Sequence, residues 1–381
     1  MKPGRQPTGN SISQKVEDTE PLPVNSSSGH QPEPLVSPVP QDTMSDHPDS
    51  YIAYSFTEKN GKLQKINVPW KDPQEGEIVV KVLACGVCGS DIFVGEQQLP
   101  TGLPRIPGHE IVGTVWAVPS TEHKFKVGER VGAGWHGGHC FSCDMCIAGN
   151  FSQCRKQTIN GIFRDGGYAE YVTLRTECMI YVSEDLDPAE TAPLLCAGIT
   201  AFNSIRHMDA SPGDLVAVQG IGGIGHLAVQ YAKAMGFNTV AISSSDAKRE
   251  LAGRLGASHF VDSSKEPPAK ALQTLGGAQM IVCAAPNEKI IEEVLMGLGP
   301  NGTLLIIALA RASVSIPIFP LVKNRISVRG WAIGNPKDTQ DCIAFSKQTG
   351  VKCLIEKFPL DKAQEAYDHR ESAKFRAVIV P

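Results

Sequence analysis

Four closely spaced cysteines constrain the fold of this chain more than any other feature of its sequence. They lie within one short stretch, with two residues between the first three and seven before the last: Cys140, Cys143, Cys146 and Cys154. Four thiolates in a tetrahedral array are the ligand set of a structural zinc ion, and they leave no coordination position for a substrate. We therefore expect a zinc ion here that stabilises a lobe of the protein and takes no part in chemistry.

A cluster of disulfides is the alternative interpretation of these cysteines. Sulfurs two residues apart in a short loop rarely meet the geometry of a disulfide, and the first residues of the chain lack the apolar segment of a secretory signal. The sequence therefore favours zinc and predicts a cytosolic location, where disulfides are rare. Its apolar runs are too short for a membrane span, so we expect no membrane partner.

Length and charge limit the class of protein. A chain of 381 residues is long enough for two hydrophobic cores, and its net charge of −4 with scattered lysines and arginines is not that of a nucleic-acid binder. We expect a small or apolar ligand instead. Residues 1–50 are rich in Pro and Ser and contain no aromatic Phe, Tyr or Trp. They are predicted to be a disordered tail, with a docking or targeting arm as the alternative.

The next segment, residues 51–205, has the pattern of a domain rich in β-sheet. Short β-prone runs at 78–84, 110–118 and 130–133 are bounded by Gly and Pro. Turns with close-set glycines occur at 85–91 and 107–110, and such turns often carry active sites. The sequence predicts that the first domain contains the catalytic residues.

Residues 206–329 alternate between buried strands and amphipathic helices. The expected strands are 214–219, 239–242, 280–284 and 303–308, and the expected helices are 226–235 and 247–255. Such alternation is typical of a parallel, doubly wound α/β sheet. We expect residues 330–381 to return to the first domain.

A glycine-rich loop joins the first strand and the first helix of this unit. Its residues are Gly220, Ile221, Gly222, Gly223, Ile224 and Gly225. Between a strand and a helix, such glycines allow a tight turn and a close approach of a pyrophosphate to the helix N-terminus. The loop predicts a dinucleotide cofactor, and the alternative is a purely structural turn.

The end of the second predicted strand bears on the choice of cofactor. Dinucleotide folds that prefer NAD place an Asp or Glu there, whereas this chain has Ser243, followed by Ser244 and Ser245 and then by Lys248 and Arg249. Hydroxyls and cations favour a 2′-phosphate, so we expect NADP(H) to be preferred over NAD(H). Alternatively, Ser245 only caps a helix whose lysine is solvated.

Taken together, these motifs resemble those of the zinc-dependent medium-chain alcohol dehydrogenases, and the chain is most similar to the cinnamyl-alcohol branch. The matching segments follow the family's order and cover everything after the tail: 86–91, 108–110, the four-cysteine lobe, 166–170, 196–200 and the glycine loop. The resemblance implies a GroES-like catalytic domain, a Rossmann domain, and assembly as a homodimer or homotetramer.

The resemblance also implies a second, catalytic zinc ion. Its ligands would be Cys88, His109 and Cys196, with Glu110 next to the metal as an alternative ligand. Two thiolates and an imidazole leave one coordination position open for a substrate oxygen. Taken singly, each residue has another interpretation, as a buried apolar thiol or as a core histidine.

Further roles follow from the same resemblance. Asp91 would accept a hydrogen bond from the imidazole of His109, and Ser90 would exchange a proton with the substrate oxygen. Thr200 would line the nicotinamide pocket, and Arg376 would contact the pyrophosphate. Many relatives carry a proton-relaying histidine where this chain has Phe93. Candidate walls of the substrate cleft are Leu99, Trp135, His136 and Trp331.

The predicted function is that of an enzyme with two zinc ions per chain. NADP(H) would exchange a hydride with a small alcohol, aldehyde or ketone, while zinc stabilises the developing charge on oxygen. An NAD-linked polyol dehydrogenase and a catalytically silent NADPH-binding protein are the two alternatives. The first shares the Gly-Ser-Asp turn that follows Cys88.

Overall fold

The computed structural model describes residues 47–309, 313–370 and 375–381. Most of the predicted disordered tail, residues 1–46, lies outside the described residues. The first strand, β1 (Ser50–Phe56), begins at the predicted start of the ordered chain and pairs with β2 (Leu63–Pro69).

The first large sheet contains seven strands in the described part of the chain, and its central strand is β3. Its strands are β3 (Glu77–Gly86), β4 (Glu110–Ala117), β5 (Arg130–Ala133), β8 (Tyr171–Arg175), β9 (Met179–Tyr181), β16 (Ile355–Pro359) and β17 (Arg376–Val380). The strands predicted at 78–84, 110–118 and 130–133 are therefore confirmed as β3, β4 and β5. A hydrophobic cluster that includes Ile78, Val80 and Ile111 packs on this sheet.

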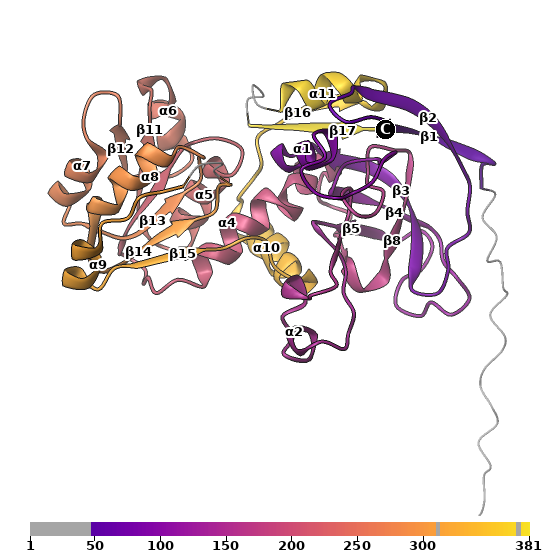
Figure 1. The fold of residues 1–381 in the computed structure, drawn as a ribbon, viewed down its shortest axis with the longest axis horizontal. Helices are drawn as coiled ribbons and strands as arrows, with labels where there is room; N and C mark the ends of the chain where they lie inside the picture. The colour runs from indigo at the N-terminus through magenta and orange to yellow at the C-terminus, as the bar shows by residue number, and fades with distance from the viewer. Residues whose placement is uncertain (1–46, 310–312, 371–374) are drawn as a thin grey trace, which may run out of the picture. The chain divides into compact units, whose positions relative to one another are not determined.

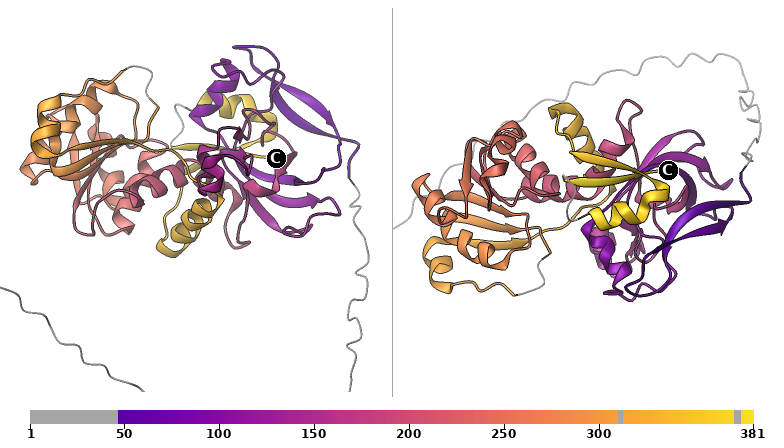
Figure 2. Two further views of the ribbon diagram at one scale, coloured as in Figure 1. Left: turned by 60° about the horizontal axis from the view of Figure 1, so that its bottom comes forward. Right: turned by 90° about the horizontal axis from the view of Figure 1, so that it is seen from above.

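The C-terminal strand β17 completes the first sheet. Val378 and Ile379 pair antiparallel with Gly86 and Cys85 of β3, and β16 pairs parallel with β17. In Figure 1 and in both views of Figure 2, the yellow C-terminal strands accordingly lie beside the purple strands of the first sheet. The chain therefore returns to the first sheet after the last strand of the second sheet.

Further strands and helices lie outside the two large sheets. They are β6 (His136–Gly138), β7 (Thr158–Ile159), α1 (Ile92–Gly95), α2 (Asp144–Ile147), α3 (Pro188–Thr191), α4 (Ala197–Arg206), α10 (Pro336–Thr349) and α11 (Ala363–His369). Helices α10 and α4 pack on each other. This contact joins the last third of the chain to the segment that follows Cys196.

The second large sheet is parallel throughout, with the order β12-β11-β10-β13-β14-β15. Its strands are β10 (Leu215–Gln219), β11 (Asn238–Ser243), β12 (His259–Asp262), β13 (Ala278–Cys283), β14 (Leu298–Ile306) and β15 (Ser327–Gly330). Strand order reverses between β10 and β13, and ligands of such sheets bind at this switch point.

Helices cover both faces of the parallel sheet. They are α5 (Gly225–Ala234), α6 (Arg249–Arg254), α7 (Pro268–Thr274), α8 (Glu288–Val294) and α9 (Ile318–Asn324), labelled in Figure 1. Val216 and Val218 of β10 belong to one hydrophobic cluster, and Ala217 between them belongs to another. Since alternate residues of a strand point to opposite faces, both faces of the sheet are buried.

The predicted doubly wound α/β architecture is confirmed. The sequence missed β12, β15 and helices α7 to α9, and it placed the helix at 247–255 where the structure has a 3₁₀ turn, Asp246–Lys248, followed by α6. The domain boundaries predicted at 205/206 and 329/330 remain predictions. None of the helices in the described ranges combines the length and the apolar character needed to cross a bilayer.

Candidate active site

Four buried side chains of metal-ligand types, drawn from residues 88 to 196, converge at one place. Cys88 follows β3, His109 immediately precedes β4, Glu110 opens β4, and Cys196 precedes α4. Their ligand atoms all lie within 4.8 Å of one another. The structure therefore brings together, from three segments of the chain, the four residues that the family resemblance implied.

The geometry of this cluster fits a zinc ion. The sulfurs of Cys88 and Cys196 are 3.9 Å apart, close to the separation of about 3.8 Å that two Zn–S bonds of about 2.3 Å give in a tetrahedral site. Nδ1 of His109 faces Asp91 Oδ1 at 3.3 Å, and Nε2 is buried without a hydrogen-bond partner among the described residues. A buried imidazole nitrogen normally has a partner, so this arrangement fits coordination of a metal ion.

The two thiols of the cluster influence each other strongly. The thiol of Cys196, donating toward Cys88, holds the pKa of Cys88 well below its usual range, against the opposing effect of burial. The same interaction raises the pKa of Cys196. A zinc ion bound here would require both sulfurs as thiolates.

Glu110 is held by a cation. Its Oε1 accepts a hydrogen bond from the guanidinium of Arg376, the first residue of β17, while its Oε2 is buried without a partner among the described residues. Burial raises the pKa of Glu110 to about 7, and the charge of Arg376 opposes this shift. Arg376, expected at the pyrophosphate, is therefore paired with the carboxylate of the cluster. It also lies next to the glycine loop, since a Cβ added at Gly223 would be 3.2 Å from its Cδ.

Side chains around the cluster occupy places consistent with their expected roles. Asp91 Oδ1 lies 3.3 Å from His109 Nδ1, and both side chains are fully buried. Ser90 is half-buried in the 3₁₀ turn Gly89–Asp91. Thr200 is buried on α4 and accepts a 3.4 Å hydrogen bond from the amide of Ile333. Their catalytic and cofactor roles remain predictions.

An aromatic side chain covers one side of His109. The ring of Trp135 packs edge-on against the imidazole with centroids 4.9 Å apart, and Phe93 lies 6.4 Å from Trp135 in a similar orientation. Phe93 therefore forms part of an aromatic wall near the cluster. Its phenyl ring offers neither a donor nor an acceptor for a proton.

The four-cysteine lobe forms a second and separate cluster. Its neighbouring sulfurs are 3.5 to 4.0 Å apart, too far for a disulfide bond of about 2.05 Å and close to the spacing in a tetrahedral Zn–S₄ site. None of the chain's cysteines forms a disulfide in the described residues. The geometry therefore fits the predicted zinc ion and argues against the disulfide alternative.

Backbone amides point at the sulfurs of this lobe. The amides of Cys140 and Lys156 donate to the sulfur of Cys154 at 3.4 and 3.3 Å. A hydrogen bond from the amide of Ser142, with smaller contributions from its hydroxyl and neighbouring groups, lowers the pKa of Cys140 to about 6. Such donors stabilise thiolates, which are the form that binds a metal.

The glycine loop lies at the switch point of the parallel sheet. Gly220 follows β10 with φ of +87°, and a Cβ there would lie 2.4 Å from that of Ala285, which follows β13. Only glycine fits both the backbone angle and the contact. Gly222 has open space around it, and Gly225 begins α5. The loop thus has the form and place of a pyrophosphate site.

The end of β11 carries the residues expected to select the cofactor. Ser243 is buried at the end of the strand, whereas Ser244 and Ser245 are exposed. Ser245 accepts a hydrogen bond from the amide of Ala247, as the alternative interpretation expected. Lys248 donates to the carbonyl of Ile221 at 2.8 Å. This lysine is therefore hydrogen-bonded to the glycine loop.

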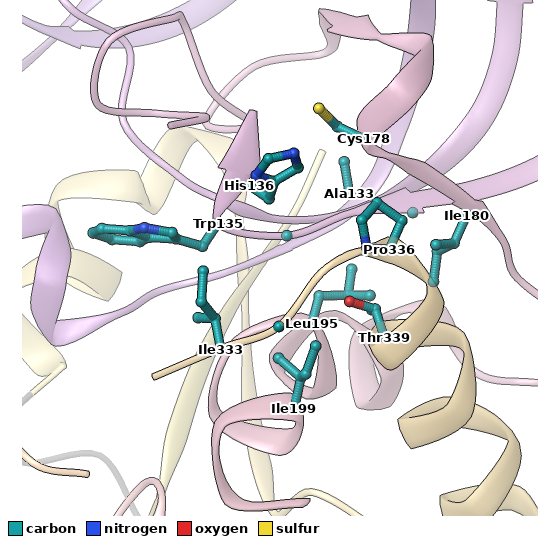
Figure 3. A pocket seen from close by; sticks show the side chains of 13 residues that line it. Ala133, Trp135, His136, Cys178, Ile180, Leu195, Ile199, Ile333, Pro336 and Thr339 are labelled. Carbon is teal, nitrogen blue, oxygen red and sulfur yellow. The ribbon is translucent and has the colours of Figure 1, made fainter. Parts of the chain in front are cut away.

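A small pocket beside the first sheet contains some of the predicted cleft residues (Figure 3). Ala133, Trp135, His136, Leu195, Ile199 and Thr339 are among the residues that line it. Its volume of about 10 Å³ holds roughly one water molecule and no aldehyde. His136 is buried, and its Nε2 lies 3.0 Å from His139 Nδ1. The predicted role of His136 as a cleft wall thus gains no support from this pocket.

One side chain near the cluster was missed by sequence reasoning. The hydroxyl of Tyr168 donates to Asp91 Oδ2 at 2.7 Å. Tyr168 belongs to the family motif at 166–170, and this membership is the only sign of a role that the sequence offers.

Comparisons with known proteins agree with this fold. The family described as "Alcohol dehydrogenase GroES-like domain" matches residues 74–184, and the family described as "Zinc-binding dehydrogenase" matches residues 223–348. An alcohol dehydrogenase of Penicillium expansum, patD, is 45% identical over 334 residues, which cover 87% of this chain and 98% of that protein. An alcohol dehydrogenase of Geobacillus stearothermophilus is 40% identical over 81% of this chain and 91% of its own length.

Solved structures give the same assignment. A cinnamyl alcohol dehydrogenase of Sorghum bicolor is 28% identical with a TM-score of 0.79, over 87% of this chain and 97% of that chain. A Helicobacter pylori protein described as CAD, complexed with NADP(H), is 26% identical with a TM-score of 0.78, over 87% and 98% of the two chains. The predicted family is confirmed: this chain belongs to the zinc-type medium-chain alcohol dehydrogenases and is an alcohol oxidoreductase.

Proposed function

We propose that the protein interconverts a small alcohol and its aldehyde or ketone as a zinc-dependent, NADP(H)-linked enzyme. One observation carries the proposal: ligand atoms of Cys88, His109 and Cys196 converge within 4.8 Å in a buried site, where Nδ1 of His109 faces Asp91 and Nε2 has no hydrogen-bond partner among the described residues. This arrangement argues against a catalytically silent protein, which has no need of an intact ligand set.

When bound, zinc polarises the substrate oxygen and NADPH supplies the hydride. Cys88, His109 and Cys196 hold the ion, and the buried Asp91 carboxylate orients the imidazole of His109. Ser90 supplies a proton to the substrate oxygen as the alcohol forms, and it removes that proton in the reverse direction. Trp135 and Phe93 keep one side of the site apolar, which limits access of water.

A second zinc ion at Cys140, Cys143, Cys146 and Cys154 is part of the proposal, with a structural role. Four sulfurs complete the coordination of this ion, so His136 and His139 do not serve as its ligands. His136 and His139 instead face each other through ring nitrogens 3.0 Å apart.

The preference for NADP(H) rests on the residues that follow β11. Ser243 and the two exposed serines after it offer hydroxyls, and no acidic residue ends the strand. One observation favours NAD(H) instead: Asp246 is exposed in the same turn and pairs with Arg249 at 2.8 Å. The carboxylate would repel a 2′-phosphate unless the arginine moves to bind it.

Initial rates with NADPH and NADH on one aromatic aldehyde test the cofactor preference. We expect a higher kcat/KM with NADPH, and a clear preference for NADH would show that the cofactor assignment is wrong. Metal analysis of the same preparation tests the zinc assignment, with two ions per chain expected. A single ion per chain, together with activity that survives Cys88→Ala, would favour a zinc-free enzyme, and the absence of any activity would favour a catalytically silent protein.

The proposed substrates are small-molecule alcohols and aldehydes. Relatives called alcohol dehydrogenases and a neighbour called a cinnamyl alcohol dehydrogenase support that class. Assembly as a homodimer or homotetramer stays a prediction, to be measured by light scattering of the purified protein.

A further inference from the structure

The motif at residues 166–170 brings a buried phenol next to the zinc-ligand cluster. The side chain of Tyr168 is fully buried, and its hydroxyl donates a 2.7 Å hydrogen bond to Asp91 Oδ2. Asp91 is separated from Tyr168 by 77 positions in the sequence. A buried hydroxyl needs a partner, and here the partner is the carboxylate of Asp91, which faces His109.

The two oxygens of Asp91 have different surroundings. Oδ2 accepts hydrogen bonds from the hydroxyl of Tyr168 and from the amide of Cys88, the latter at 2.9 Å. Oδ1 faces His109 Nδ1 at 3.3 Å and has no hydrogen-bond partner in the described ranges. Two donors therefore fix one oxygen of the carboxylate, and the other oxygen is left for the imidazole.

Backbone contacts from the same motif hold the segment before His109. The amide of Gly167 donates to the carbonyl of Gly108 at 2.9 Å, and the amide of Tyr168 donates to that of Pro107 at 3.1 Å. Gly108 has φ of +100°, and a Cβ there would lie 2.5 Å from Cδ1 of Tyr168. The tyrosine ring therefore fills the space that glycine leaves beside the histidine.

We infer that Tyr168 is a positioning residue that orients His109 through Asp91. The inference rests on the proposed function, because the orientation matters only if His109 binds a metal. Tyr168 touches neither substrate nor metal in this role. It fixes the rotation of the Asp91 carboxylate and, through that carboxylate, the ring plane and the tautomer of the imidazole.

The phenol is suited to act as a donor. Burial, and next to it the negative charge of Asp91, raise the pKa of Tyr168 well above its usual range. The hydroxyl therefore keeps its proton at any working pH. Phenylalanine would fill the same space and remove only the donor.

The test compares Tyr168→Phe with Tyr231→Phe. Tyr231 is also fully buried, and its hydroxyl lies 2.7 Å from Ser346 Oγ and 3.2 Å from Cys342 Sγ. Within the described ranges this hydroxyl makes no hydrogen bond to Asp91 or to the zinc-ligand cluster. Each variant therefore loses one buried hydroxyl with its hydrogen bonds, so the stability of both should fall. Only Tyr168→Phe should change the metal site.

The readout is zinc release from the purified protein to a chromogenic chelator, followed over time. The kinetic phase of zinc release that the Cys88→Ala variant lacks is assigned to the zinc-ligand cluster that contains Cys88. We expect Tyr168→Phe to accelerate this phase by about three- to tenfold, since one hydrogen bond to a charged group is lost. Replacement of zinc by Co²⁺ gives a second readout, in which the visible absorption bands should shift in Tyr168→Phe and stay unchanged in Tyr231→Phe.

A double-mutant cycle with Asp91→Asn tests the route of the effect. If Tyr168 acts through Asp91, Tyr168→Phe should add little to the release rate in the Asp91→Asn background. Equal acceleration by Tyr168→Phe and Tyr231→Phe, or full additivity with Asp91→Asn, would overturn the inference. If the wild-type protein has no release phase that depends on Cys88, the proposed zinc site itself is wrong.

Discussion

The two clusters of metal-ligand side chains differ in how the chain builds them. The four-cysteine lobe uses only residues 140 to 154, and two of its cysteines are half-buried. The Cys88 cluster draws on residues 88 to 196, and all four of its side chains are buried. A local loop thus completes one site, whereas the other needs β3, β4 and the start of α4 in place at once. A closed, local site suits a stabilising role, whereas a buried, distributed site can hold an ion beside a substrate.

Removal of a ligand from the distributed cluster should have the largest effect. We expect Cys88→Ala to lower kcat by about 10³-fold or more, since a bound Lewis acid contributes several kcal/mol to the barrier. Zinc content should fall by one ion per chain while the lobe keeps its ion. Steady-state rates and metal analysis measure both quantities. Cys283→Ala, at a buried thiol on β13 outside both clusters, is the control.

Removal of a ligand from the lobe should act on stability instead. We expect Cys143→Ala to lower the melting temperature by about 6–12 °C, which corresponds to about 3 kcal/mol for a domain of this size. Protein that remains folded below the transition should retain its kcat. Thermal denaturation and rates at low temperature check both expectations. A fall in kcat without a change in melting temperature would contradict the structural role of the lobe.

Substitution of a residue next to each cluster should distinguish the roles of the two clusters further. Asp91 lies beside His109 in the distributed cluster, and we expect Asp91→Asn to weaken zinc binding there by about 10- to 100-fold. Competition with a chelator of known affinity measures this loss. Binding that equals that of the wild type would show that the imidazole is held by packing alone.

The corresponding substitution in the four-cysteine lobe should have the smallest effect. Ser142 donates a hydrogen bond to Cys140 Sγ over 3.7 Å and is exposed. We expect Ser142→Ala to change the free energy of unfolding by less than about 0.5 kcal/mol, because the backbone amides that hold the sulfurs remain. Chemical denaturation of the variant and the wild type checks this. A loss as large as that of Cys143→Ala would mean that the side chain, and not the backbone, holds the lobe together.

Much of the fold could be predicted from the sequence because its signals are local. The alternation of buried strands and helices from Asp214 to Ala308, and the turn required at Gly220, depend on near neighbours in the chain. Strand β15 was missed because its residues are largely exposed, which hides the apolar pattern of a buried strand. Helices α7 to α9 have seven residues each, too few for a clear helical period.

The sequence predicted which residues form the candidate site. It did not predict which of their side chains contact one another. Cys88, His109 and Cys196 were identified by family motifs, and their convergence depends on pairings between distant strands. The partner of Glu110 illustrates the limit: Arg376 is 266 positions away, and it was assigned to the cofactor alone. The contact between Tyr168 and Asp91 was missed for the same reason. Spacing in a sequence carries no information on which side chains meet across a sheet.

The return of β17 to β3 has a consequence for synthesis of the protein on the ribosome. β8 pairs with residues 77–81 of β3, so until residues 376–380 emerge only the end of β3 at Cys85 and Gly86 lacks a partner strand on that edge. Until then the buried carboxylate of Glu110 also has no counter-ion. A nascent chain therefore holds a finished parallel sheet and an unfinished catalytic half at the same time. Contacts that span so much sequence form slowly, and an open strand edge attracts other chains. The sheet that carries the candidate active site is therefore the last part of the protein to gain all its strand pairings.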